Sequence, residues 1–361
     1  MFTVDLSESW DWTNNISLKA NQEKSNAPQL ARGALYPDPS SPSSFYLFGG
    51  ATPQDNLSFS GQESPLPAAD SLWSYDTIKD EWRSYNMSKY GLTRPASGAD
   101  AYVPDLGLAF WYNGMQDNGS ATETGVINDT TLFLGGMTVL DLHNQSARNL
   151  STKAVSNKAR VRGQMVHVPL PGTDGIIVLI GGGEKPNTNT EHDWKGTLVS
   201  MGTVDVFDVG SLKNSSTPDG VWYSQPTSGS PPDPRLDACM VVAAAPDDSS
   251  YNIYMYGGRN GLAVYYDEVW VLSLPSFQWK KLYQGQAPRY SMTCHLVGQR
   301  QLITVGGSDT SHLTDDKSNC DWQTKMVEIL DLTDISWSSK YDAYAAPYEV
   351  PTEVVKMIGG T

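Results

Sequence analysis

One pattern recurs along this chain of 361 residues, and it limits the folds that the chain can adopt. Each copy has an arginine before an apolar run, a second apolar run that ends in a glycine pair, an alternating run that ends in aspartate, and a late tryptophan. The copy from Arg289 to Trp337, with its pair at Gly306 and Gly307, shows this order in full. Such runs between turn residues predict a four-stranded antiparallel sheet. One sheet cannot bury both faces alone, so it needs neighbours of its own kind.

Four earlier copies begin at Arg32, Arg94, Arg162 and Arg235, so the five arginines are interpreted as one repeated position. Three of these copies carry glycine pairs, at Gly49-Gly50, Gly181-Gly182 and Gly257-Gly258. The copy from Arg94 is degenerate, because Asn113-Gly114 replaces the glycine pair and no tryptophan closes it. The third strands are predicted at 72–76, 137–141, 204–208, 269–274 and 326–331.

The two ends of the chain together predict a sixth copy. Residues Glu353 to Gly360 read as its first half, and Phe2 to Leu6 with Trp10 read as its second half. If the two halves pair, the array closes and exposes no unpaired strand edge.

A glycine pair after an apolar strand, an aspartate-ended strand and a following tryptophan resemble the kelch repeat over essentially the whole chain. The resemblance implies an all-β fold, a six-bladed kelch-type β-propeller of the galactose oxidase and kelch superfamily, with the closing blade shared between the N- and C-terminal segments. The chain is then one domain, residues 1–361, with approximate blades 341–361 with 1–20, 21–90, 91–158, 159–228, 229–284 and 285–340. The copies exceed the family period of about 50 residues, and the excess lies mainly in loops after the glycine pairs. These loops should emerge on one face, where recognition usually occurs.

Charge and hydropathy exclude some partners. With 40 acidic and 25 basic residues the net charge is −15, so nucleic acid and anionic membranes would be repelled. No apolar run approaches the roughly 18 residues of a spanning helix, and the first five residues are not a signal peptide. We therefore expect no membrane contact by this segment, although an anchor could lie outside it.

Eight Asn-x-Ser/Thr sequons fall in or beside predicted loops, where glycans can be carried. Their asparagines are Asn15, Asn56, Asn86, Asn118, Asn128, Asn144, Asn149 and Asn214. The sequons could simply be turn residues that co-occur. The other interpretation is a glycoprotein of the secretory pathway, either secreted or an ectodomain on the outer face of the plasma membrane, whose signal peptide lies outside this sequence.

Three cysteines leave at least one without an intramolecular partner. Cys294, on an inner strand, and Cys320, in the following loop, belong to one blade, and we expect a disulfide between them if the compartment is oxidising. Cys239 is expected to pack as a small apolar side chain.

By resemblance to kelch domains that hold acidic ligands with arginines at the channel mouth, the five repeated arginines could form a positive ring. They could equally tie each blade to a neighbouring acidic or carbonyl group. A second candidate is the pair of loops with His192-Asp193-Trp194 and Asp321-Trp322, because an indole can stack on a sugar while a carboxylate takes its hydroxyls. The same residues could instead cover a blade edge and cap turns.

The weakest candidate is a metal set of His312, Asp316 and Cys320, spaced by four and similar to the Glu, Asp, Cys set of plant specifier-type kelch proteins. Three matching residues can also arise by chance. A copper site of the galactose oxidase type finds no support, since only His167 and His295 fall on inner strands, where they are expected to be core histidines. The sequence predicts no cofactor.

Together these features predict a non-enzymatic extracellular kelch propeller that recognises a protein or glycan through its long loops and central funnel. Its repeats resemble the ectodomains of kelch-repeat surface proteins of filamentous fungi. The alternative is an enzyme that uses the funnel, either a metal-dependent oxidoreductase or a carbohydrate-active lyase or hydrolase. Fold alone does not choose between them.

Overall fold

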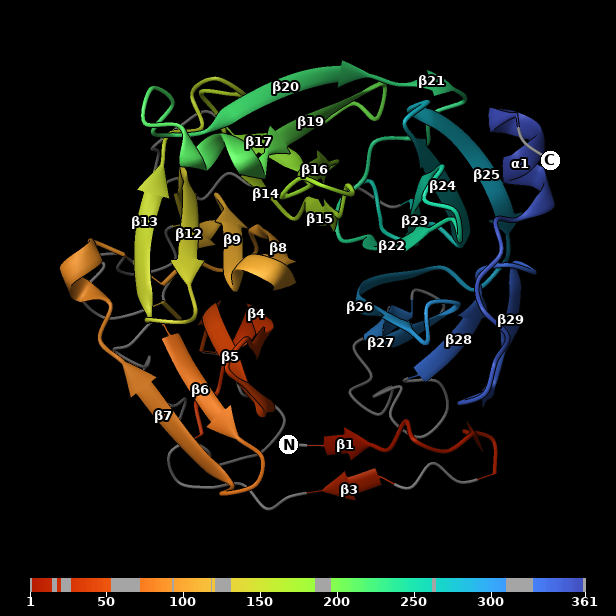
Figure 1. Cartoon of the computed structure of the whole chain (residues 1–361), viewed down its shortest axis with the longest axis horizontal. Helices are drawn as coiled ribbons and strands as arrows, with labels where there is room; N and C mark the ends of the chain where they lie inside the picture. Colours follow the sequence, from red (N-terminus) through yellow and green to blue (C-terminus); the bar gives the residue numbers. More distant parts are fainter. Residues whose placement is uncertain are drawn as a thin grey trace. The chain divides into compact units, whose positions relative to one another are not determined.

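The computed structural model describes residues 2–14, 18–20, 27–52, 72–92, 94–117, 119–120, 131–185, 196–261, 264–309 and 327–359. Within these ranges short strands dominate, and antiparallel sheets follow one another along the chain (Figure 1). The prediction of an all-β fold is confirmed, and the sheets are consistent with a propeller. The chain divides into two compact units, of which unit 1 comprises Met1–Lys24, Ser200–Val204 and Gln225–Thr361, and unit 2 comprises Ser25–Val199 and Asp205–Ser224.

Unit 2 contains two four-stranded sheets and most of a third, each a meander in chain order. The first has β4 (Ala31–Asp38), β5 (Ser41–Ala51), β6 (Leu72–Asp76) and β7 (Glu81–Tyr85); the second has β8 (Ala99–Val103), β9 (Leu108–Tyr112), β12 (Met137–Asp141) and β13 (Ser146–Leu150). The third has β15 (Gln164–Val168), β16 (Ile176–Ile180), β19 (Thr203–Asp208) and β20 (Val221–Pro226).

Smaller elements accompany these sheets. They are the ribbon of β10 (Met115–Gln116) and β11 (Leu132–Phe133), the ribbon of β14 (Ala159–Val161), β17 (Gly183–Lys185) and β18 (Thr197–Leu198), and 3-10 turns at Ser88–Tyr90, Pro104–Leu106 and Val209–Lys213.

Unit 1 contains two further meanders. One has β22 (Cys239–Ala244), β23 (Tyr251–Tyr256), β24 (Glu268–Leu274) and β25 (Gln278–Gln284), with β21 (Ser228–Gly229) added in parallel to β25; the other has β26 (Arg289–Val297), β27 (Gln301–Asp309), β28 (Val327–Asp331) and β29 (Ser336–Ser338). The remaining elements are β1 (Phe2–Val4), β2 (Trp10–Asp11), β3 (Leu18–Ala20), β30 (Lys340–Tyr341) and the helix α1 (Thr352–Ile358).

The apolar faces of neighbouring sheets pack on each other within each unit. In unit 2, Phe110 and Met137 of the second sheet belong to the same buried cluster as Ile177 and Phe207 of the third. Strand β24 in unit 1 is buried along its whole length, since both of its faces are covered. This double burial is why a run such as Val269 to Leu274 is almost continuously apolar rather than alternating.

The glycine pairs exist because the next sheet approaches them closely. Gly49 and Gly257 have φ values of 69°, and a Cβ at either would lie 2.4 Å from a carbonyl oxygen, that of Pro95 or of Arg289. The second glycine of each pair donates its N–H to that same carbonyl, at 2.7 Å from Gly50 and 2.9 Å from Gly258. A side chain at the first position would therefore break the junction between two sheets.

The degenerate copy keeps this junction with different chemistry. Asn113 has a φ of 50°, a left-handed conformation that asparagine tolerates better than most residues. Its Oδ1 accepts the backbone N–H of Arg160 at 2.9 Å, and its Nδ2 donates to the carbonyl of Gly136 at 2.8 Å. Gly114 then donates to the carbonyl of Arg160 at 3.2 Å, as the second glycines do elsewhere.

The prediction of a strand over Glu353 to Gly360 is wrong. Helix α1 covers Thr352–Ile358 instead and lies beside β25, in the same unit (Figure 1). Val354, Met357 and Ile358 recur at helical spacing and join the apolar cluster of that unit, and Val354 is fully buried. Two apolar pairs in a short segment had suggested a strand, but the buried side chains follow a period of 3.6.

The N-terminal segment pairs with residues shortly before the helix. Trp10 pairs with Tyr341 across β2 and β30, the Tyr341 hydroxyl donates to the carbonyl of Leu6 at 3.0 Å, and the two rings lie 5.3 Å apart. Strand β1 pairs with β3. The N-terminal segment therefore pairs with Lys340–Tyr341 and not with residues 353–360, as had been predicted.

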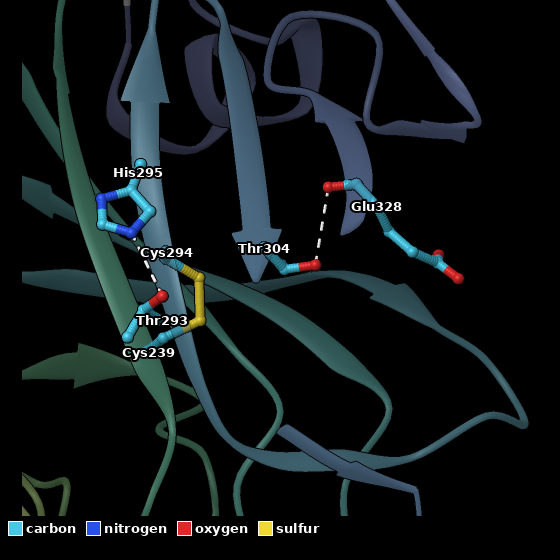
Figure 2. Close-up of a disulfide and its surroundings, with 6 residues drawn as sticks. All are labelled: Cys239, Thr293, Cys294, His295, Thr304 and Glu328. Atoms are coloured by element: carbon cyan, nitrogen blue, oxygen red, sulfur yellow. Dashed lines mark hydrogen bonds between the residues drawn. A yellow bond between two sulfur atoms is a disulfide. The ribbon is translucent and has the colours of Figure 1, made fainter. Parts of the chain in front are cut away.

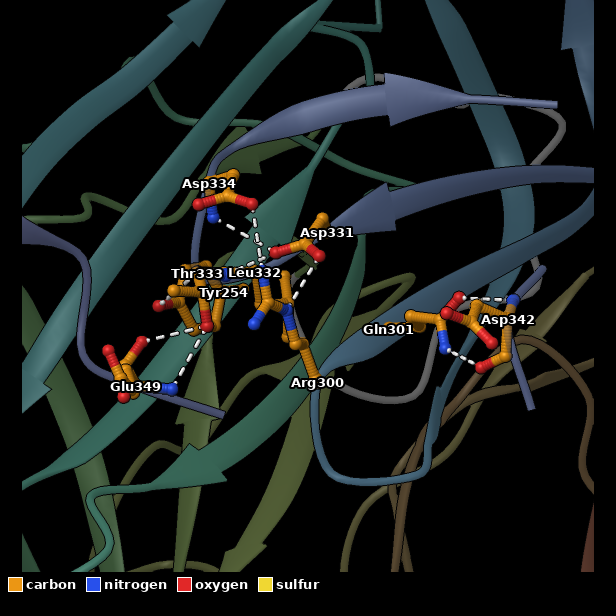
Figure 3. Close-up of polar contacts among 9 residues, drawn as sticks. All are labelled: Tyr254, Arg300, Gln301, Asp331, Leu332, Thr333, Asp334, Asp342 and Glu349. Carbon is orange, nitrogen blue, oxygen red and sulfur yellow. Dashed lines mark hydrogen bonds and ion pairs between the residues drawn. The ribbon is translucent and has the colours of Figure 1, made fainter. Parts of the chain in front are cut away.

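Polar contacts fix the segment that follows β29 (Figure 3). The side-chain amide of Gln301 donates to the carbonyl of Asp342 at 2.6 Å and accepts its N–H at 2.9 Å. The Thr333 hydroxyl exchanges hydrogen bonds with the backbone of Glu349, both at 3.0 Å. These bonds direct the chain from the last sheet toward α1.

Substitution of Gly49 by alanine tests the junction. We expect a loss of about 3 kcal/mol in unfolding free energy, from the left-handed backbone and from overlap with the Pro95 carbonyl. Gly172→Ala is the matched control, because Gly172 has a φ of 74° but no atom lies within 4 Å of the position that a methyl group would take there, so only about 1 kcal/mol is expected. Equal thermal midpoints for the two variants would contradict the explanation.

Candidate functional site

A residue with left-handed backbone lies within the first three residues of the first strand of each meander, or two residues before that strand. These residues are Arg32, Ser97 and Arg162 in unit 2 and Asp237 and Ser291 in unit 1, with φ values between 55° and 62°. Within each unit they are joined in series, since Ser97 donates its N–H to the carbonyl of Arg32 at 3.1 Å, Arg162 to that of Ser97 at 2.9 Å, and Ser291 to that of Asp237 at 2.9 Å. A row of backbone hydrogen bonds thus links one sheet to the next.

This row shows that the five repeated arginines do not occupy one position, so that prediction is wrong. Arg32 and Arg162 are at the left-handed position, Arg235 and Arg289 lie two residues earlier, and Arg94 lies three residues before Ser97. The true equivalent of Arg235 in the third sheet is Arg160, which the sequence reasoning missed because Arg162 follows so closely. Backbone conformation, which spacing alone does not reveal, decides the register.

The arginines two residues before the left-handed position serve the scaffold. Each donates to the carbonyl of the first glycine of its own pair: Arg160 Nε to Gly181 at 2.7 Å, Arg235 Nη1 to Gly257 at 3.1 Å, and Arg289 Nη1 to Gly306 at 3.1 Å. All three are buried. These arginines therefore hold the glycine pair of their own copy, and the bonds do not run to a neighbouring group as the alternative interpretation expected.

Arg235 is the most completely enclosed of the three. Its Nη2 donates to Glu268 at 2.8 Å, its guanidinium lies 3.7 Å from the centre of the Tyr266 ring, and only 2% of its surface is exposed. Glu268 also accepts from Trp270 at 2.8 Å and Lys281 at 2.6 Å. The charge of Arg235 is neutralised inside unit 1.

Arg94, Arg32 and Arg162 differ from that group. Arg94 is buried, donates from Nη2 to the carbonyl of Gly119 at 2.9 Å, and has a pKa lowered by its burial. The Arg32 side chain is 50% exposed and lies 3.6 Å from the Asp117 carboxylate. Arg162 is partly buried. Of the predicted ring, Arg32 and Arg162 keep the more accessible side chains, and a ligand role for them stays a prediction.

Several predicted site residues lie outside the described residues. They are His192, Asp193, Trp194, His312, Asp316, Cys320, Asp321 and Trp322. Within the described ranges no three His, Cys, Asp or Glu side chains form a group that could hold a metal ion. Of the two inner-strand histidines, His167 contacts the carbonyl of Asp174 at 3.2 Å, whereas His295 is exposed rather than a core residue.

The predicted disulfide partner of Cys294 is wrong. Cys294 is joined to Cys239, and not to Cys320, so the bond connects β26 with β22 of the neighbouring sheet (Figure 2). The two innermost strands lie against each other in unit 1, and their Cα atoms at these positions are 5.5 Å apart. Sequence proximity favoured Cys320, whereas the stacking of repeats brings equivalent strands together.

A further group was not recognised from the sequence. Arg259 directly follows the glycine pair of its copy, its Nε donates to Asp237 at 2.8 Å, and its guanidinium lies 4.7 Å from the centre of the Tyr290 ring. The Tyr265 ring is 5.4 Å from that of Tyr290. We name Arg259, Asp237, Tyr265 and Tyr290 the tyrosine shelf.

Four sequon asparagines fall within the described ranges, and all four are exposed: Asn86, Asn144, Asn149 and Asn214. They lie near the outer strands of unit 2, after β7, in the turn between β12 and β13, on β13, and after the 3-10 turn Val209–Lys213. Asn15, Asn56, Asn118 and Asn128 lie outside the described residues. In the described part of the chain, no helix has the length and apolar character needed to cross a membrane.

No family model matches the chain. It is 28% identical over 384 residues to a kelch repeat-containing protein of Arthroderma benhamiae, an alignment that covers 94% of this chain and 52% of that protein. This similarity supports a kelch-repeat protein. The chain spans about half the length of that relative. A shorter alignment, with 24% identity over 150 residues, covers 38% of this chain and 3% of the flagellar outer arm dynein alpha chain of Chlamydomonas reinhardtii.

Replacing Arg235 by methionine tests whether the repeated arginine geometry is structural. The variant removes one of the three hydrogen-bond partners of the buried Glu268, together with the bond from Arg235 to the Gly257 carbonyl, so we expect a loss of about 3 kcal/mol. Arg32→Met removes only an exposed ion pair and should cost less than about 1 kcal/mol. Thermal unfolding of both variants, followed by circular dichroism, measures the difference. A similar midpoint for both would refute the structural role.

A carboxyl group on the innermost strand of the second sheet makes stability depend on pH. Burial raises the pKa of Asp100 from 3.8 to about 6. The native state holds this proton more tightly than the unfolded chain does. The contribution of Asp100 to the free energy of unfolding is therefore full below pH 4, and roughly 3 kcal/mol of it is lost as pH rises through 6. Asp100→Asn should flatten the dependence of the unfolding midpoint on pH between 4 and 6. An unchanged slope would contradict this assignment.

Proposed function

We propose that this kelch-repeat chain is a non-enzymatic binding propeller that works outside the cell, with six blades closed into a ring and a protein or glycan partner held on its loop face. Kelch-repeat propellers commonly bind proteins. The observation that carries the extracellular part is the disulfide between Cys239 and Cys294. Disulfides persist in oxidising compartments and are rare where glutathione keeps thiols reduced.

The exposed sequons support the same compartment. Asn86, Asn144, Asn149 and Asn214 are all solvent-exposed, so a glycan could be attached at any of them without entering the core. Their positions near outer strands would place the glycans away from the innermost strands of unit 2.

The repeated junction supports the closed ring. Within each unit, the same two backbone hydrogen bonds join successive sheets, one from the second glycine position and one between left-handed residues. A geometry that repeats with each sheet favours continuation until the array closes, since closure removes exposed sheet faces. With β1 and β3 as its outer strands, the N-terminal ribbon would contribute to the sixth blade.

The scaffold role of the buried arginines supports binding by loops rather than chemistry in the funnel. Each of these side chains donates a hydrogen bond to a glycine carbonyl and so stabilises its sheet: Arg160, Arg235 and Arg289. Recognition then falls to side chains on the loops that this rigid frame presents. The tyrosine shelf is one such group.

Expression behind a secretion signal in a glycosylating host tests the proposal. We expect an endoglycosidase-sensitive mass shift, and Asn144→Gln and Asn214→Gln should each remove one glycan. Thiol titration of the denatured, unreduced protein should find one free cysteine out of three. Asn252→Gln is the control, since Asn252 is fully buried outside any sequon and its change should leave the glycan mass unaltered. Three free thiols together with no glycan would overturn the extracellular assignment.

A further inference from the structure

The tyrosine shelf is accessible as well as ordered. Tyr265 and Tyr290 are partly buried, so their rings are held in place while part of each faces solvent. Around them Val264 is 47% exposed, and Gly261 and Ser291 are exposed. The shelf therefore offers two aromatic rings at a surface of unit 1.

Arg259 is held at the shelf by its own backbone and by Asp237. Isolated bridges connect Arg259 with Leu236 on one side and Tyr265 on the other. The Asp237 carboxylate accepts Nε, and among the described residues no acceptor is found for the two Nη groups of Arg259. This contrasts with Arg235, whose Nη groups both donate to protein acceptors. Arg259 thus keeps donors beside the rings for a ligand.

The disulfide supports both sides of the shelf. Asp237 lies two residues before Cys239, and Tyr290 lies four residues before Cys294. The N–H of Ser291 donates to the carbonyl of Asp237 at 2.9 Å, so the two strands are joined beside the shelf by a hydrogen bond and a covalent bond. Preorganised side chains lose little freedom on binding, which favours affinity.

The chemistry favours a neutral sugar over an acidic ligand. The charge of Arg259 is balanced by Asp237, and the chain as a whole carries −15, so an added carboxylate gains little. A sugar ring presents an apolar face that can stack on an aromatic ring, and its hydroxyl oxygens accept hydrogen bonds from a guanidinium fork. Such a ligand uses every feature of the shelf without bringing a net charge to it.

We propose that the tyrosine shelf binds a neutral hexose unit of a glycan, an inference that rests on the proposed binding function and names its ligand class. The sugar ring stacks on Tyr290 and Tyr265, and the Nη groups of Arg259 donate to adjacent hydroxyls. Asp237 acts as a positioning residue for Arg259. The shelf residues lie on loops and strand ends beside the glycine pair of one copy.

Isothermal titration of the disulfide-bonded, secreted chain with cellohexaose, laminarihexaose and mannohexaose tests the inference. At least one should bind, with Kd raised about tenfold or more by Tyr290→Ala and by Arg259→Leu, since stacking and the donors are lost. Tyr290→Phe keeps the ring and should stay within about threefold of the unmodified chain. Tyr223→Ala is the matched control, because Tyr223 is 57% exposed on the outer strand β20.

A second variant separates a loss of binding from a loss of folding. Val264→Glu alters only an exposed side chain at the shelf edge and should weaken binding without lowering the thermal midpoint. Absence of binding to all three oligosaccharides, or equal affinity in Tyr290→Ala, overturns the inference. So does shelf-dependent binding of a glutamate-rich peptide in place of the sugars. A glycosylated, disulfide-bonded chain that fails these tests would leave the proposed location and fold intact and remove only the sugar site.

Discussion

The rest of this structure depends on the close approach of neighbouring sheets at the glycine pairs. A carbonyl oxygen from the segment that leads into the next sheet lies 2.4 Å from where the Cβ of Gly49 or Gly257 would be, and the following glycine donates its N–H to that oxygen. Burial of apolar faces holds sheets together without fixing their relative position, because it has no direction. The backbone hydrogen bonds supply that direction, and they are possible only where side chains are absent or, as with Asn113, make the bonds themselves.

The sequence predicted the strands well because their signal is local. Runs such as Leu72 to Asp76 and Ile176 to Ile180 have the length and apolar content of strands, and the glycine pair that follows Ile180 has the positive φ values that glycine adopts readily. Helix α1 was misjudged because seven residues hold too few periods to separate a strand from a helix. Which of its side chains become buried depends on packing against the neighbouring sheet, and the segment alone does not reveal that packing.

The candidate site was less predictable because it depends on register between sheets. Counting residues grouped Arg162 with Arg235, whereas backbone conformation groups Arg160 with Arg235. The same limit applies to Cys239 and Cys294, whose proximity follows from stacking of equivalent strands. Arg259 and Tyr290 belong to different copies, so no spacing rule within one copy could bring them together. The glycine pair before Arg259 was the one available signal.

The disulfide also changes how the chain would respond to a cut or a pull. Because its two cysteines are 55 residues apart, the whole of β22 to β25 lies within a covalent loop. Tension applied at the two termini would pass through the sulfur bridge and bypass these four strands. A protease that cleaved the turn between β24 and β25 would leave one covalently continuous molecule, because both fragments stay joined through the sulfur bridge.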